Sequence, residues 1–412
     1  MLKTHFRNLF HPFIEKLKRL PIKYFVAMYI ALKILLIVFL IKPYNYNLWS
    51  LVGIWDGFFK LNPKYFCKGI IVFQNGGYDG QFFYLITKYL VTENISLPIL
   101  DSFYLRFHRI GLSLVLFPFI KIFGVSIYPF VLSTLLTLFH LLSFYSLKAL
   151  CETDKKYFSL FYLFSPFSLN SDLLLVADSL MVSFLIIGLY FFIRSQILSN
   201  QNFIKKKYLY LSIFLFGISL FVKEGALFLI APFILYSILQ KKWSAVLVFF
   251  LVILSYISFT QYTKTISGTH PGTNPLNFLE LSDLPFFGLL KSFDTPNDSK
   301  GIIRELIKIP LLFYFIFLIS LVGKKWSLNS LIFYSPIFFT LLQIAIAEEG
   351  YWRAFDNISR MYALSLPYSI FLYSEKNTFR FKAVMTTGLC ILLLLILRIV
   401  LIKKEMPFNV FL

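Results

Sequence analysis

Hydrophobic runs long enough, or nearly long enough, to cross a lipid bilayer recur along the whole chain and limit what it can fold into. About 20 consecutive apolar residues form a helix that spans the hydrocarbon core. Of the 412 residues, 58% are hydrophobic, which is more than a soluble domain of this length can bury. The sequence therefore predicts an all-α polytopic membrane protein and excludes a soluble or disordered chain.

The apolar runs predict about eleven spans, and the first is interpreted as a retained span because no cleavage site of small residues follows it. The preceding stretch 6–20 could lie on the inner surface as an amphipathic helix. A run over 110–123 could form a twelfth span, or a helix that dips into the bilayer and returns. The expected spans are 24–42, 127–149, 157–171, 174–193, 208–222, 226–240, 243–262, 305–323, 328–347, 360–374 and 382–402.

Charge decides between these alternatives. The net charge of +20 would suggest nucleic acid in a soluble protein, but Lys and Arg at the ends of membrane helices act as orientation signals instead. If the N-terminus is cytoplasmic and 110–123 does not span, every short inner connection is basic; the pair Lys403–Lys404 then lies outside. The inner basic residues are Lys148, Lys155, Lys156, Arg194, Lys205, Lys206, Lys207, Lys241, Lys242, Lys324, Lys325, Lys376, Arg380 and Lys382.

This orientation gives one integral membrane domain, 1–412, with a cytoplasmic N-terminus over 1–23. Two large extracytoplasmic loops, 43–126 and 263–304, have room for non-helical structure, and juxtamembrane helices are expected in the first. High use of Lys, Ile, Asn and Phe suggests an AT-rich coding genome, and hence a bacterial inner membrane. Most of the acidic and His residues that could take part in chemistry then lie on the outer side: Asp79, His108, Asp172, Asp178, Glu224, His270, Asp283, Glu348, Glu349 and Asp356.

The first outer loop contains a carboxylate between glycines and aromatic residues, in the sequence Gly76-Gly77-Tyr78-Asp79-Gly80-Gln81-Phe82-Phe83-Tyr84. Glycines allow the backbone to approach a ligand closely. Further along, Arg106 and Arg109 would share one face if 104–109 is helical, and two guanidinium groups suit a phosphate. The alternative is an ordinary turn followed by arginines that anchor the chain at the membrane interface.

These stretches resemble the first loop of bacterial membrane proteins with the GT-C glycosyltransferase architecture. The resemblance lies in the run 78–84, in Tyr104-Leu105-Arg106-Phe107-His108-Arg109-Ile110-Gly111 and in Phe123-Gly124. Relatives by architecture include protein O-mannosyltransferases, the lipid A aminoarabinose transferase and the mannosyltransferases of GPI assembly. The resemblance implies that the first loop carries an essential acidic residue, here Asp79, and that juxtamembrane helices precede the second span.

One departure from that pattern concerns the acidic residue. Many members of the class carry paired acidic residues in this loop, whereas Asp79 has no acidic neighbour and Asp56 is the nearest carboxylate upstream. Metal dependence and the identity of the base therefore stay open, and no cofactor other than a divalent cation is considered. Cys67, Cys151 and Cys390 lie too far apart to indicate a zinc site or a disulfide framework.

Three later positions are expected to join the site. Asp178 would lie one to two turns inside the span 174–193, where a carboxylate is costly and should face a wet cavity. Lys223-Glu224-Gly225 places an adjacent ion pair between two apolar runs; it is either a solvated turn or part of the cavity. Arg360 resembles the arginine that contacts the donor phosphate in related enzymes, and we favour it over Arg353.

The resulting hypothesis is a glycosyltransferase that takes a sugar from a polyprenyl-phosphate donor and passes it, with inversion, to a lipid, glycan or protein acceptor on the extracytoplasmic face. Asp79 would be the general base. A transporter or lipid flippase is the alternative, and a non-catalytic membrane partner is a third. The residues expected to contact substrate are Tyr78, Gln81, Arg106, His108, Arg109, Asp178, Lys223, Glu224 and Arg360.

Overall fold

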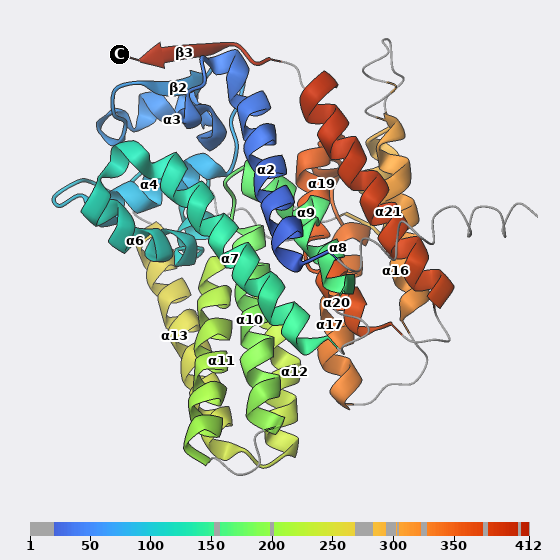
Figure 1. Ribbon diagram of the computed structural model, residues 1–412. Coiled ribbons are helices and arrows are strands. Elements are labelled where there is room, and N and C mark those ends of the chain that lie inside the picture. The colour runs from blue at the N-terminus through green and yellow to red at the C-terminus, as the bar shows by residue number, and fades with distance from the viewer. Residues whose placement is uncertain are drawn as a thin grey trace, which may run out of the picture.

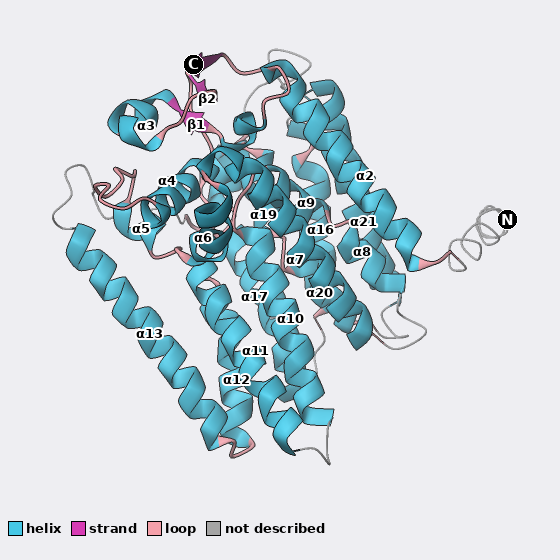
Figure 2. Ribbon diagram, turned by 60° about the vertical axis from the view of Figure 1, so that its left-hand side comes forward, coloured by secondary structure: helices cyan, strands magenta, loops and turns pink. Residues whose placement is uncertain are grey.

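The computed structural model describes residues 20–151, 157–197, 202–267, 283–293, 302, 305–322, 328–373, 378–402 and 405–411. The predicted surface helix over 6–20 and His270 therefore lie outside the described residues, as do Lys155, Lys156, Lys324, Lys325, Lys376, Lys403 and Lys404 among the predicted basic connections. Within the described residues the chain is mainly helical, with one small sheet (Figures 1 and 2).

The first half of the described chain contains the following helices: α2 (Ile22–Ile41), α3 (Asp56–Leu61), α4 (Gly80–Val91), α5 (Phe103–Phe107), α6 (Gly111–Phe123), α7 (Tyr128–Leu150), α8 (Ser159–Leu163), α9 (Pro166–Leu173), α10 (Asp178–Ile197) and α11 (Asn202–Val222). The second half contains α12 (Ala226–Leu239), α13 (Trp243–Ser267), α14 (Phe287–Lys291), α16 (Lys308–Leu321), α17 (Leu328–Ala345), α18 (Glu349–Arg353), α19 (Phe355–Met361), α20 (Ser365–Phe371) and α21 (Thr378–Leu397), followed by a π-helical turn (Arg398–Ile402).

The protein is membrane-embedded, as the sequence predicts. Among the described residues, five helices are long and apolar enough to cross a bilayer: Ile22–Tyr44, Val125–Leu150, Asp178–Ile197, Trp243–Ile266 and Thr378–Leu401. Shorter apolar helices cover Gly111–Phe123, Ala226–Leu239, Lys308–Leu321 and Ser330–Ala345.

Two of the predicted spans are not continuous helices. The segment 157–171 is divided into α8 and α9, because Ser165 caps α9 by accepting a hydrogen bond from Ser168 N (3.3 Å) and Pro166 occupies its first turn. Proline has no N–H and clashes with the preceding helical turn, so it favours a new helix start over a continuation. The segment 360–374 is likewise divided between α19 and α20 by the turn at 362–364.

The position expected for Asp178 is also wrong. Residues 174–177 form a tight turn with Leu175 at φ 53°, and the backbone N–H of Ser179 donates to Ser171 Oγ (3.1 Å). The helix α10 consequently begins at Asp178 instead of at residue 174. Asp178 therefore lies at the end of a helix, where it can reach a cavity.

The first predicted loop, 43–126, folds as a layer of short elements at one end of the molecule. Figure 1 shows α4 and α6 together beside the small sheet and α3. With 13 residues, α6 is only about 20 Å long at 1.5 Å per residue, too short for a hydrocarbon core of about 30 Å. Leu112, Leu116 and Ile120 are buried, whereas Ile122 and Phe123 at its end are exposed.

The same layer contains a sheet that the all-α prediction missed. Strand β1 (Ile54–Trp55) pairs in parallel with β2 (Ile70–Phe73), and β3 (Phe408–Phe411) pairs antiparallel with β2. The register joins Ile70 with Phe411 and Phe73 with Phe408, and the four β2 residues are buried. The C-terminal strand β3 thus lies against the first loop (Figure 1).

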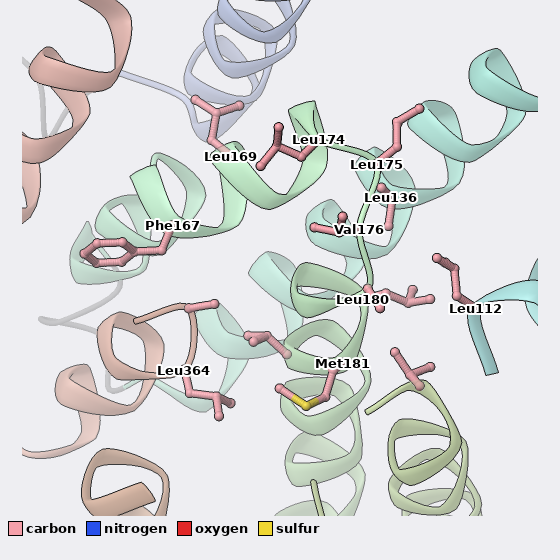
Figure 3. Close-up of a cluster of buried hydrophobic side chains, with 14 of the residues drawn as sticks. Leu112, Leu136, Phe167, Leu169, Leu174, Leu175, Val176, Leu180, Met181 and Leu364 are labelled. Carbon is pink, nitrogen blue, oxygen red and sulfur yellow. The ribbon is translucent and has the colours of Figure 1, made fainter. Parts of the chain in front are cut away.

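The helices α10 to α13 extend away from this layer, so that the connection from α12 to α13, with Lys241 and Lys242, lies at the opposite end (Figures 1 and 2). Where the two parts meet, a hydrophobic core surrounds the α9–α10 turn. Figure 3 shows Leu175 and Val176 of the turn with Leu136 of α7 and Leu180 of α10 close by. All four are buried, so this core fixes the turn that presents Asp178.

Candidate functional site

A cavity of about 350 Å³ lies where the first loop meets the helices, a size suited to a small-molecule site. Its lining comes from the first loop, from the start of α10, from the turn between α11 and α12, and from the late segment 343–361. Among the described residues its walls include four acidic and four basic side chains: Asp79, Asp178, Glu224, Glu348, Arg106, Arg109, Lys223 and Arg360.

Asp79 stands between two arginines that are far apart in sequence. Its Oδ1 accepts a hydrogen bond from Arg106 Nη1 (3.2 Å), and its Oδ2 accepts one from Arg360 Nη1 (3.1 Å). Two glycines beside it allow this placement. A Cβ on Gly77 would lie 2.2 Å from Gly53 O, and one on Gly80 would lie 2.8 Å from the backbone oxygen of residue 52. Larger residues would push the loop out of the site.

The pKa of Asp79 reflects these neighbours. Burial by itself would raise the pKa of the carboxyl group, because it penalises the charged form. The positive charges of Arg360, Arg106 and Arg109 outweigh that effect and hold the pKa of Asp79 well below its usual range. The carboxylate is therefore ionised at neutral pH.

Arg106 has a second and stronger partner that sequence reasoning missed. Asp101 accepts from Arg106 Nε (2.9 Å) and Nη2 (2.7 Å), a bidentate pair. The helix α5 begins between them, with Ser102 as its cap. The guanidinium also lies over the ring of Phe82, 4.2 Å from its centroid. The sequence does carry a signal for this pair. It is a carboxylate just before the N-terminus of a helix, close to an arginine in the second turn of that helix.

The expectation that Arg106 and Arg109 share a helix face is wrong, because α5 ends at Phe107 and Arg109 lies in the turn before α6. Both side chains nevertheless line the cavity. Arg109 binds a different acid: its Nε donates to Glu224 Oε2 (2.7 Å) and its Nη2 donates to Oε1.

Glu224 collects a second contact from His108, whose Nε2 lies 3.2 Å from Glu224 Oε2. Burial would raise the pKa of Glu224, but the Arg109 charge and the His108 hydrogen bond lower it well below its ordinary value. Lys223 does not pair with Glu224, contrary to the sequence expectation; its Nζ donates to Asp178 Oδ1. The turn between α11 and α12 sends the two side chains to different partners.

Asp178 also connects this cluster to Arg360, whose Nη1 lies 3.9 Å from Asp178 Oδ2. Arg360 Nη2 donates to Asn357 Oδ1 (3.1 Å) within α19. The four basic side chains that line the cavity are therefore each paired with a carboxylate.

Two predicted substrate-binding residues have structural roles in the described chain. Gln81 is buried, and its Oε1 accepts from Trp55 N (3.0 Å). Tyr78 packs on Gly53, and its backbone N–H donates to Gly53 O (2.9 Å). Neither residue lines the cavity, and His108 reaches it only through Glu224.

The helix that carries Arg360 is held by residues that sequence reasoning did not connect. Arg398, just after α21, forms a bidentate pair with Asp356 of α19 at 2.5 and 2.7 Å. Asn170 of α9 donates to Ser359 Oγ (2.8 Å). Asp56, the alternative base, pairs with Lys60 at 2.9 Å and does not line the cavity.

Metal ligands are not assembled at this site. Within the part of the chain that the structure describes, no group of three or more His, Cys, Asp or Glu side chains is arranged to hold a metal ion. The oxygens of Asp79 already face guanidinium groups, a surrounding that suits an anion better than a cation.

No protein-family model, curated protein or solved structure matches the chain.

Proposed function

We propose that the protein is an integral membrane glycosyltransferase of the GT-C kind, which transfers a sugar from a polyprenyl-phosphate-linked donor to an acceptor hydroxyl. The observation that carries the proposal is the position of Asp79, a carboxylate facing a cavity and flanked by Arg106 and Arg360. A base and two cationic forks within one small cavity are what displacement at a phosphate-linked sugar needs.

The proposed reaction is a single displacement. The acceptor oxygen attacks the anomeric carbon, and its proton passes to Asp79. The bond from that carbon to the phosphate oxygen breaks, and the electron pair leaves with the lipid phosphate. Arginine forks stabilise the charge that develops on the leaving group. Attack from the side opposite the phosphate inverts the anomeric carbon.

The proposal includes eleven crossings, with the N-terminus in the cytoplasm and the cavity on the outer face of a bacterial inner membrane. The short α6 and the position of Lys241 and Lys242 far from the cavity layer support it. The segments proposed to cross are α2, α7, α8 with α9, α10, α11, α12, α13, α16, α17, α19 with α20, and α21.

A transfer assay tests the function. Purified protein in lipid nanodiscs is incubated with a panel of polyprenyl-phosphate sugars and lipid, glycan or peptide acceptors, and products are identified by mass spectrometry. We expect one donor to support transfer, and we expect Asp79→Asn to abolish it. Asp56→Asn removes a carboxylate from the same loop outside the cavity and should keep wild-type activity. Equal activity of both variants would remove Asp79 as the base.

A transporter or lipid flippase is the second candidate, and the interrupted segments α8–α9 and α19–α20 favour it. Broken helices near a polar site are typical of transporters. Cysteine labelling separates the two functions. The glycosyltransferase proposal expects cysteines at positions 79, 223 and 360 to react only from the outer side. Labelling from both sides, with substrate flux in proteoliposomes and no transfer, would favour transport.

A further inference from the structure

We propose that Asp79 and the phosphate of the donor compete for the same two guanidinium groups, so that phosphate binding releases Asp79 to act as the base. The inference deepens the proposed function, and it relies on that function for the identity of the ligand as a lipid-linked phosphate. It explains why the arginines predicted to bind phosphate are all paired in the described structure.

The contacts of Asp79 make it a carboxylate that an incoming anion can replace more readily than Glu224. Each of its oxygens accepts from one arginine only, at 3.2 Å from Arg106 and 3.1 Å from Arg360. Glu224, by comparison, accepts hydrogen bonds from two nitrogens of Arg109 and also contacts His108 Nε2. A phosphate oxygen that took one Asp79 contact would break a single hydrogen bond.

The arginines would stay in place after Asp79 leaves. Arg106 keeps its bidentate pair with Asp101, and Arg360 keeps Asn357 and its approach to Asp178. Each guanidinium therefore presents the face that Asp79 occupied, already oriented toward the cavity. Arginine forks held in this way favour the tetrahedral oxygens of a phosphate.

The charges of the cavity connect this exchange to catalysis. The formal charges of the four acidic and four basic side chains that line the cavity cancel. A bound phosphodiester with one negative charge therefore makes the filled cavity net negative. Extra negative charge favours proton uptake by a carboxylate. Asp79, separated from its two arginines, is then the group that takes the acceptor proton. A neutral ligand would leave both ion pairs intact and would not release it.

Binding measurements test the exchange. The affinity of the purified protein in nanodiscs is measured for geranyl phosphate, geraniol and inorganic phosphate, in wild type, Asp79→Asn and Asp56→Asn. Removing the competing charge should tighten geranyl phosphate binding by about tenfold or more in Asp79→Asn, although that variant is inactive. Asp56→Asn should bind like wild type, because its charge is paired with Lys60 outside the cavity. Geraniol should bind equally to all three.

The pH dependence gives a second readout. The charged groups facing Asp79 are Arg106 and Arg109 from the first loop and Arg360 from α19, with Asp178 of α10 beside Arg360. The arginines do not titrate below pH 8, and the second ionisation of geranyl phosphate, at about pH 6, changes the same ligand for every variant. The ratio of wild-type affinity to Asp79→Asn affinity should therefore rise as pH falls toward 4. Size-exclusion profiles of both variants report whether they are folded.

The outcomes separate the inference from the proposed function. Unchanged or weaker geranyl phosphate binding in a folded Asp79→Asn variant overturns the competition, even if wild type transfers sugar. Tighter binding without any sugar transfer by wild type supports the competition and overturns the enzyme proposal. A gain for inorganic phosphate alone overturns the lipid-linked ligand.

Discussion

Two aspartates, Asp172 and Asp178, flank the α9–α10 turn, and each forms an ion pair. The two pairs differ in how accessible they are from the cavity. Asp178 faces the cavity, pairs with Lys223 and approaches Arg360. Asp172, in the last turn of α9, pairs with Lys33 of α2 at 2.9 Å, and both side chains are almost completely buried.

The environment of the deeper pair is closed. Lys33 Nζ also donates to Thr137 Oγ1 (2.7 Å), and the Ser179 hydroxyl donates to Asp172. A buried and fully partnered pair holds α2, α7 and α9 in one arrangement, because losing either partner leaves a buried charge. The pair at the cavity is more open, since Asp178 and Lys223 keep 9% and 22% of their side-chain surface exposed, and the nearby Asp79 carboxylate keeps 31%. The comparison teaches that access, and not the kind of side chain, separates the structural pair from the cluster that lines the cavity.

The largest expected effect comes from a substitution at Asp79, in the cluster that lines the cavity. Asp79→Asn should lower the rate of sugar transfer by at least about a thousandfold, since general-base catalysis contributes about 10² to 10⁴ and the amide cannot accept the proton. Its thermal unfolding midpoint should fall less than that of a variant that breaks the buried pair, because Asp79 is partly exposed. A fall in that midpoint as large as for the buried pair would contradict the comparison.

The next largest effect comes from removing one partner of the buried pair of Lys33 and Asp172. Asp172→Asn leaves Lys33 charged and buried, so we expect a loss of about 3–5 kcal/mol in stability, the usual cost of breaking such a pair. Thermal unfolding in nanodiscs measures it. The double variant Lys33→Met with Asp172→Leu should recover much of the loss. Sugar transfer per folded molecule should fall less than in Asp79→Asn.

A smaller effect tests the late arginine. Arg360→Gln removes one of the two forks at Asp79, and we expect transfer to fall by about 10- to 100-fold with the fold intact. Arg353→Gln is the matched control, since Arg353 pairs with Glu349 on an exposed surface and does not line the cavity. Initial rates at saturating donor compare the two. Equal losses would show that the segment acts only as a scaffold.

The smallest effect concerns acid stability. The pKa values of Asp79 and Glu224 are lowered in the folded protein. Their contribution to stability is therefore complete above the unfolded values of about 4 and is lost as pH falls below them. The unfolding midpoint should be constant between pH 5 and 8 and should drop below about pH 4. Glu224→Gln should reduce the drop; the same drop in that variant would exclude its contribution.

Hydrophobic patterning predicted the long helices well, because most long apolar runs correspond to one helix. The run 24–42 forms Ile22–Ile41, and 226–240 forms Ala226–Leu239. Interruptions were harder to predict. Pro166 lies within an otherwise apolar run, and the turn that delays α10 to Asp178 depends on side-chain hydrogen bonds with Ser171.

Asp79, Arg106 and Arg360, which the sequence hypothesis assigned to one site, line one cavity. Their partners could not be predicted in the same way. Asp79 and Arg360 are 281 residues apart, and their contact depends on how α4 and α19 pack. Asp101, Arg398 and strand β3 were missed because periodicity describes one element at a time and not the pairing between elements.

The most direct test of the central claim is the stoichiometry of one turnover. Purified protein receives a donor labelled in both the sugar and the lipid, and glycosylated acceptor and released polyprenyl phosphate are quantified together. We predict that wild type forms the two products in a one-to-one ratio with an inverted anomeric carbon, and that Asp79→Asn forms neither. Transfer by Asp79→Asn at the wild-type rate, or movement of intact donor across the bilayer without either product, would contradict the account.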